Sequence, residues 1–203
     1  MITSYFMKTI LYITFLSFLF TSSASADFKL GVDAYIANDY VTAYKELKPF
    51  AEQGNADAQQ KLGYMYVTGQ GVTQDYKEAV KWYRLAALQG NADAQHNLGI
   101  SYDIGQGVTQ DYKEAAKWFR LAAHQGNVHA HYNLGWLYWQ GKGVIKNYVL
   151  SHMWFNIAAI NGDQEAEKAR AALEIQIKSK EKIARAKKLA RECIENHYKN
   201  CRL

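Results

Sequence analysis

The sequence has almost no proline and only two cysteines. Pro49 is the single proline among 203 residues, whereas Ala, Leu, Lys and Glu are common. Because proline interrupts regular structure and those four residues favour helices, the composition favours helix over sheet. The length suits one elongated array or one globular domain.

The motifs of common catalytic sites are also missing. Ser101 and Ser151 have no Gly-x-Ser-x-Gly context, and no glycine-rich loop continues into the Lys-Ser/Thr of a phosphate loop. His129 and His131 stand two residues apart, so on a helix their rings point to opposite sides. No pair of carboxylates stands out. We therefore expect no catalytic residue, no cofactor and no metal site.

Charge is sparse except near the C-terminus. The net charge is +5, and from Gln164 onward there are eleven Lys/Arg and six Glu, so this tail carries the whole excess. The rest of the chain is neutral, and we therefore expect no nucleic-acid partner.

The one long apolar run lies at the N-terminus. Lys8 precedes residues 10–20, and Ala24 and Ala26 follow them with cleavage-site spacing. A membrane anchor is the alternative, but about 11 strongly apolar residues are too few where about 20 are needed. The pattern predicts a cleaved signal peptide over residues 1–26. We expect an exported protein, periplasmic or secreted, with no integral membrane span after cleavage.

One stretch is written three times. Residues 53–59 recur unchanged as 89–95, residues 71–79 recur as 107–115, and a third, altered copy starts at Gln125. The offset of 36 residues is typical of a repeat array. We expect units at about 27–54, 55–90, 91–126 and 127–162, with a partial unit at 163–176.

Each full unit is predicted to form two helices. Asn55 follows a glycine and precedes an Ala-rich run, which is the pattern of a helix cap. A first buried stripe and a second one then follow at helical spacing. The stripes are Ala58, Leu62 and Tyr66, then Tyr76, Ala79, Trp82 and Ala86, with their copies. Gly63, Gly99 and Gly135 fall in mid-helix, where we expect two helices to approach closely.

The tail, residues 177–203, is predicted to be a basic amphipathic helix that caps the array. The alternative is a basic helix on an anionic membrane surface. Before it, Ala166, Ala171 and Leu173 are expected to pack on the third full unit. The apolar face of the terminal helix comprises Ile183, Ala186, Leu189, Ala190, Cys193 and Ile194.

The two cysteines, Cys193 and Cys201, suit an exported protein with a disulfide. On a continuous helix they would lie roughly 12 Å apart, which is too far for a bridge. A disulfide therefore requires the helix to end near residues 196–200, and we expect that it does. Two free thiols are the alternative.

The repeats resemble Sel1-like repeats, relatives of the tetratricopeptide repeat with a longer loop. The resemblance implies an all-α, right-handed α-solenoid of antiparallel helix pairs that binds proteins or peptides as an adaptor. Some cysteine-rich relatives are associated with β-lactams, but residues 55–162 contain no cysteine. The motif comprises Ala58, Leu62, Gly63, Tyr66, Gly69, Gly71, Val72, Asp75, Ala79, Trp82, Ala86 and Ala87.

The copies differ most on one face of the first helix of each pair, which lines the concave groove in tetratricopeptide-like arrays. In the third copy this face is rich in aromatic residues, which are common interface anchors. The alternative is that the C-terminal helix covers them as core. The predicted partner-binding residues are His129, Tyr132, Trp136, Trp139, Gln140, His96, Ile100 and Tyr64.

The sequence thus predicts a monomeric, non-enzymatic binder of a protein or peptide. A cell-wall or β-lactam-directed hydrolase is the alternative from another class, and a structural scaffold in an envelope complex is a third.

Overall fold

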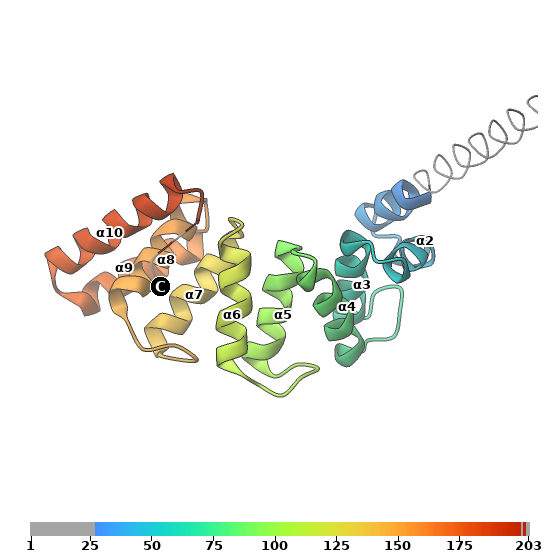
Figure 1. Cartoon of the computed structure of the whole chain (residues 1–203), viewed down its shortest axis with the longest axis horizontal. Coiled ribbons are helices and arrows are strands. Elements are labelled where there is room, and N and C mark those ends of the chain that lie inside the picture. Colours follow the sequence, from blue (N-terminus) through green and yellow to red (C-terminus); the bar gives the residue numbers. More distant parts are fainter. Residues whose placement is uncertain (1–26, 200, 202–203) are drawn as a thin grey trace, which may run out of the picture.

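The computed structural model describes residues 27–199 and residue 201. The predicted signal peptide, residues 1–26, lies outside this part of the chain. In the part described, helices joined by turns and loops are the only regular secondary structure, which confirms the predicted all-α class (Figure 1). A helix over residues 27–36 is followed by α2 (Tyr40–Glu52), α3 (Ala56–Thr68), α4 (Tyr76–Leu88), α5 (Ala92–Ile104), α6 (Tyr112–Ala123), α7 (Val128–Gln140), α8 (Tyr148–Ile160), α9 (Gln164–Ile177) and α10 (Lys180–Glu195).

Repeated side-chain caps fix where the helices begin. Asn55 caps α3 by accepting a hydrogen bond from the amide of Ala58, and the copies at α5 and α7 do the same, at 2.9 Å each. Asp75 caps α4 through the amides of Lys77 and Glu78. Such caps satisfy amides that the helix itself leaves without partners.

The two helices of each unit meet at a glycine. A β-carbon on Gly63 would lie 2.5 Å from the Tyr83 ring, and one on Gly99 would lie 2.6 Å from Phe119. The aromatic ring of the second helix therefore rests directly on the backbone of the first. This confirms the close approach predicted for these glycines.

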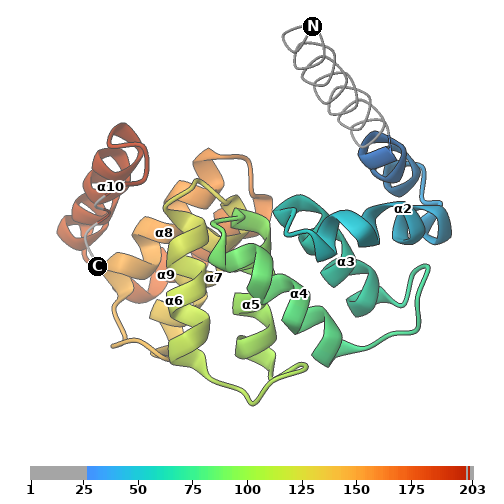
Figure 2. The ribbon, with the colours of Figure 1, turned by 45° about the vertical axis from the view of Figure 1, so that its right-hand side comes forward.

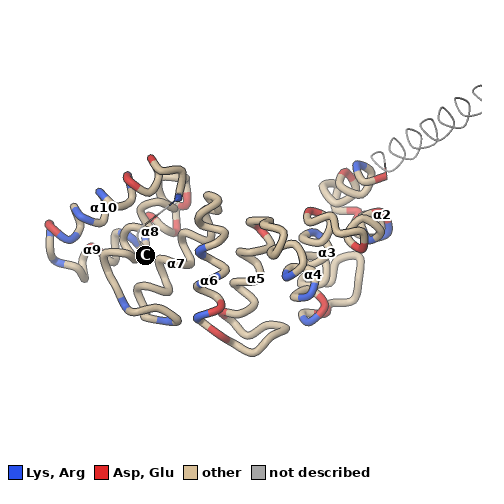
Figure 3. Tube along the Cα trace, in the orientation of Figure 1, with Lys and Arg blue, Asp and Glu red and all other residues tan. Residues whose placement is uncertain are grey.

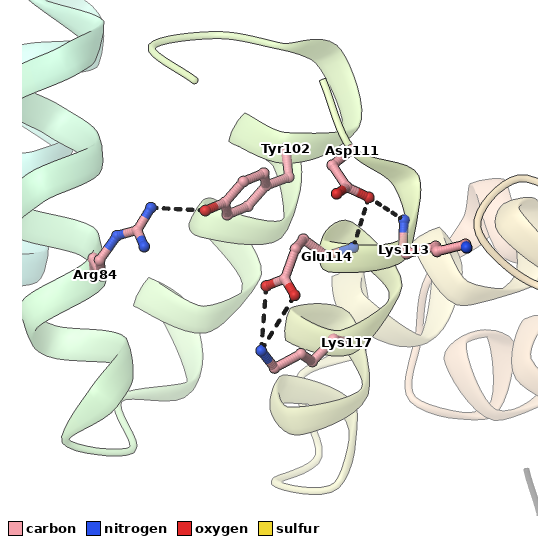
Figure 4. A network of polar contacts seen from close by, with 6 residues as sticks. All are labelled: Arg84, Tyr102, Asp111, Lys113, Glu114 and Lys117. Carbon is pink, nitrogen blue, oxygen red and sulfur yellow. Dashed lines mark hydrogen bonds and ion pairs between the residues drawn. The ribbon is translucent and has the colours of Figure 1, made fainter. Parts of the chain in front are cut away.

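Successive units also contact each other through the loop between their helices. A β-carbon on Gly107 would collide with the backbone carbonyl of Tyr76 in the unit before it, and Gly71 has the same relation to Tyr40. The Arg84 guanidinium of α4 donates to the Tyr102 hydroxyl of α5 at 2.7 Å (Figure 4). The helices therefore stack in sequence order, as the repeat pattern predicts for an α-solenoid (Figure 1).

The core follows the predicted stripes except at several aromatic positions. Tyr76, Tyr112, Tyr148 and Trp82 are half-buried. Ala58, Leu62 and their copies are fully buried. Tyr66 and Tyr102 are only half-buried, because each hydroxyl reaches a polar side chain of a neighbouring helix, Tyr44 and Arg84 respectively. Buried tyrosines keep such a partner for the hydroxyl group.

The C-terminal helices do not form another pair. Both α9 and α10 pack against α8, and they contact each other little (Figure 2). Ala166 and Leu173 are buried as predicted, but Ala171 is exposed. That expectation was wrong because Ala169, not Ala171, faces α8 with Leu173 at four-residue spacing.

A disulfide joins Cys193 and Cys201, whose Cα atoms are 4.7 Å apart. As predicted, α10 ends at Glu195, and a turn with positive φ at His197 and Tyr198 brings the chain back. The Tyr198 hydroxyl donates to Asn161 at 3.2 Å. The tail is therefore attached to the loop that follows α8.

Candidate functional site

The surface formed by α3, α5, α7 and α9 carries all the predicted partner-binding residues, and we call it the first-helix face. Neighbouring first helices are linked by side chains. Asn127, at the start of α7, donates to Asp93 of α5 at 3.0 Å, and the Trp139 indole of α7 donates to Gln176 of α9 at 3.0 Å. The face is therefore one continuous surface across the units.

Three of the predicted residues form a single aromatic cluster on α7. The rings of Trp136 and Trp139 stack at 4.7 Å with 10° between their planes. Tyr132 meets Trp136 edge to face at 6.2 Å, and Phe155 of α8 lies beneath, 5.7 to 5.9 Å from all three rings. All three are half-buried. We call Tyr132, Trp136 and Trp139 the aromatic cluster.

The helix that packs beside the aromatic cluster is not the C-terminal helix named in the alternative drawn from the sequence. The helix beside Trp139 is α9, whose apolar side packs against the same cluster through Ala169, Leu173 and Ile177. The basic helix α10 packs mainly on α8 instead. The aromatic rings are thus supported on one side and remain partly open on the other.

A cavity of about 190 Å³ lies beside Trp136, between α5 and α7. It is of the size that holds one side chain of a ligand, and it combines an indole with charged and amide groups. Its lining residues are Asp103, Phe119, Asn133, Trp136, Leu137, Gln140 and Lys142. Only Trp136 and Gln140 among them belong to the partner-binding residues predicted from the sequence.

Asp103 is the half-buried acidic residue of this cavity. Desolvation raises the pKa of its carboxyl group, and the positive charge of Lys142 partly opposes that rise. A carboxylate held half-buried without an ion-pair partner among the described residues can accept hydrogen bonds from a ligand. Sequence comparison of the copies could have found it, since the matching position in the third copy is Trp139.

The predicted histidines, His96 and His129, lie side by side next to the aromatic cluster. The His96 ring lies 5.8 Å from that of His129, and its Nε2 lies 3.1 Å from the Asn133 amide nitrogen. Burial lowers the pKa of His96 to about 4, and the neighbouring His129 contributes to the lowering. His96 is therefore neutral near pH 7. The His129 side chain is exposed to solvent.

The other predicted residues differ in their distance from the cluster, and Gln140 lines the cavity beside Trp136. Tyr64 is 37% exposed on α3 and contacts Tyr35, with ring centroids 6.1 Å apart. Ile100 is half-buried and packs on the core of α6 to α8. Gln140 is exposed at the end of α7. The structure thus brings six predicted residues into one region and leaves Tyr64 apart. The six are His96, His129, Gln140 and the aromatic cluster.

Two histidines are fully buried outside this face. His131 stacks on Trp154 at 5.6 Å, and its Nε2 lies 3.0 Å from the Ala123 carbonyl oxygen. His152 contacts the Glu174 carboxylate at 2.7 Å. Both contacts join helices within the core. Across residues 27–199 and 201 no group of three or more His, Cys, Asp or Glu side chains is placed to hold a metal ion, and no helix there is long and apolar enough to cross a membrane.

The three full repeats match a known repeat family. A model of the Sel1 repeat matches residues 56–91, 92–127 and 128–163. No curated protein matches the chain. Among solved structures, the chain is similar to c5321, a protective antigen of uropathogenic Escherichia coli strains with an SLR fold, at 35% identity and a TM-score of 0.73 over 82% of this chain.

It is also similar to a Sel1 repeat protein from Oxalobacter formigenes, at 38% identity and a TM-score of 0.68 over 73% of this chain. The chain spans only 37% and 61% of the lengths of these two proteins. Cysteine rich protein B from Helicobacter pylori shares the fold, at 20% identity and a TM-score of 0.51, over 64% of this chain and 94% of its own.

Proposed function

The chain belongs to the Sel1 repeat family, and on that premise we propose that it is an exported adaptor that binds a protein or peptide through its first-helix face. Sel1 repeats are generally binding scaffolds without enzymatic activity. Export and binding through the first-helix face are the two parts of the proposal that go beyond membership of the family.

The observation that carries the proposal is the aromatic cluster beside the 190 Å³ cavity. Partly exposed tryptophans next to a pocket supply large apolar contact area at little loss of side-chain entropy. Asp103, Asn133 and Gln140 add hydrogen-bonding groups at its edge, which would set the orientation of a bound segment. The ligand we expect is one apolar or aromatic side chain on an extended peptide.

Site-specific photo-crosslinking in the producing cell tests this function. A photoreactive phenylalanine analogue replaces exposed Gln140 on the first-helix face or, as the matched control, Leu85, which is 47% exposed on α4. We expect a discrete adduct from position 140 that disappears with Trp136→Ala, and none from position 85. Equal adducts from both positions would contradict the proposed face.

Export is supported by the apolar run before residue 27 and by the Cys193–Cys201 disulfide. Cell fractionation combined with N-terminal sequencing tests it. We expect the protein outside the cytoplasm with Asp27 as its first residue. Recovery of an uncleaved chain from the cytoplasm would contradict export while leaving the binding proposal untouched.

The hydrolase alternative is not favoured. It was drawn from cysteine-rich relatives, whereas residues 55–162 contain no cysteine. The likeness to the Helicobacter pylori protein, at 20% identity, shows the fold alone. No specific arrangement of side chains in the described residues supports a nucleophile with an adjacent base.

A further inference from the structure

The outer surface of α8 differs in chemistry from the equivalent surfaces of α4 and α6. Three positions that are charged in both earlier copies are apolar in the third. Lys77 and Lys113 correspond to Val149, Glu78 and Glu114 to Leu150, and Lys81 and Lys117 to Met153. Because the copies share one fold, the earlier two show what this surface looks like when only solvent faces it.

Helix α10 covers one part of this apolar surface. Met153 and Ile157 are fully buried, whereas Leu85 and Leu121, which match Ile157, are 47% and 41% exposed. Ala186, Ala190 and Cys193 form the buried side of α10. The changes at positions 153 and 157 are thus explained by the packing of α10 on α8.

The other part is left open as a groove of about 580 Å³ between α10 and the start of α8. Its apolar residues are Val149, Leu150 and Leu189, all half-buried. Its polar rim consists of Asn147, Arg185, Lys188 and Glu192. Asn147 already accepts hydrogen bonds from the amides of Val149 and Leu150 at 3.0 and 3.1 Å. The charged groups of the rim all come from α10.

That rim is predominantly positive. Lys188 approaches Glu192 at 3.8 Å, but Arg185 has no acidic partner within the described residues. Figure 3 shows basic residues along α10. The loop before α8 has changed in the same direction, since Lys142 and Lys146 stand where the earlier copies have glutamines. Ile145, a threonine in both earlier copies, is 90% exposed there.

We propose that this groove is a second binding site, separate from the first-helix face, for a peptide segment of another protein that carries apolar residues flanked by carboxylates. The apolar side chains contact Val149, Leu150 and Leu189, and the carboxylates lie near Arg185 and Lys188. An anionic membrane surface is the other candidate for a basic helix. The shape of the groove favours the peptide. The apolar residues of the groove lie in a recess, which a protruding side chain can enter but the flat surface of a bilayer cannot.

Fluorescence anisotropy with the chain from residue 27 onward tests the proposal. The probes are labelled eight-residue peptides with a central pair chosen from Leu, Ile, Phe and Trp between runs of Asp or Glu. The control peptides carry Asn or Gln in place of the acids. We expect acidic peptides to bind with a Kd below about 1 mM, and the matched amide peptides to bind at least about tenfold more weakly.

Two charge-reversal variants locate the binding. Arg185→Glu with Lys188→Glu should weaken peptide binding about tenfold or more. Lys113→Glu with Lys117→Glu makes the same change of net charge on the exposed side of α6 and should have little effect. Circular dichroism confirms that both variants remain folded. Trp136→Ala should leave this binding unchanged, which separates it from the proposed function of the first-helix face.

Three outcomes would overturn the proposal. The first is that none of the acidic peptides binds below about 1 mM. The second is that both charge-reversal pairs weaken binding equally, which would indicate a general electrostatic effect. The third is that the chain sediments with vesicles of phosphatidylcholine and phosphatidylglycerol while it binds no peptide, which would assign the surface to the membrane.

Discussion

The ring of Phe155 lies so close to Gly135 that a β-carbon on that glycine would sit 2.5 Å from two ring carbons. The same relation joins Phe119 to Gly99 and Tyr83 to Gly63. One aromatic ring on one glycine therefore sets the spacing of the two helices in every full unit. This contact is where the repeat should tolerate substitution least.

Gly99→Ala should destabilise the protein. In an exposed helix the same change stabilises by about 1 kcal/mol because glycine is a poor helix former. Here the added methyl group overlaps Phe119, and overpacking of this kind costs about 1 to 3 kcal/mol. Urea denaturation followed by circular dichroism measures the change. The double variant Gly99→Ala with Phe119→Leu should recover part of the loss, and a stabilising Gly99→Ala would contradict the close contact.

The two stacked tryptophans should separate binding from stability. Trp136 lines the cavity, whereas the Trp139 indole donates a hydrogen bond to Gln176 of α9. We expect Trp136→Ala to abolish the crosslinked adduct while the melting temperature falls little. Trp139→Ala should instead loosen α9, which amide hydrogen exchange detects as faster exchange confined to residues 164–177. A large, cooperative loss of stability with Trp136→Ala would show that it belongs to the core.

Loss of the disulfide should loosen the tail without unfolding the repeats. Chain-entropy arguments give about 2 to 3 kcal/mol for a loop of this length. Tyr198, inside that loop, contacts His131 and bonds to Asn161, so both contacts should weaken. We expect reductant to lower the melting temperature and to accelerate hydrogen exchange in α10 first. The Cys193→Ala, Cys201→Ala variant, which has no disulfide to reduce, is the control and should not respond to reductant.

The structure is predictable from the sequence where the chain repeats itself. Identical residues at a fixed offset specify the same caps, the same mid-helix glycine and the same packing in each unit, so the helices and the reason for Gly63 could be predicted. The pairing of Cys193 with Cys201 followed from export and from the geometry of a helix that must end between them. The candidate aromatic residues were found because the third copy departs from the other two.

The prediction was weakest where no internal copy exists. The path of α9 and α10 depends on tertiary packing, and helical spacing alone placed Ala171 on the wrong side of α9. The change from two lysines to the apolar Met153 would have shown where α10 packs. The cavity beside Trp136 could not be predicted, because Asp103 and Lys142 come together only through the stacking of two units.

His131 makes stability depend on pH in a defined window. Burial lowers the pKa of His131 from 6.5 to about 4, because its Nδ1 has no hydrogen-bond partner among the described residues and a proton there would be buried unpaired. The unfolded chain takes up that proton near pH 6.5, whereas the folded protein does so only near pH 4. The free energy of unfolding is therefore highest above pH 6.5. It falls by up to about 3 kcal/mol as the pH drops toward 4.

Replacement by the residue that the earlier copies carry isolates this effect. Gln59 and Gln95 occupy the matching positions, and the Gln95 amide donates to the Ala87 carbonyl as the His131 ring contacts that of Ala123. His131→Gln should therefore fold and should flatten the decline of stability between pH 6.5 and 4. Urea denaturation at pH 7.5, 6 and 5 for both proteins measures it. A residual slope from His96 is expected in each, so the difference between the two curves is the test, and parallel curves would contradict the assignment to His131.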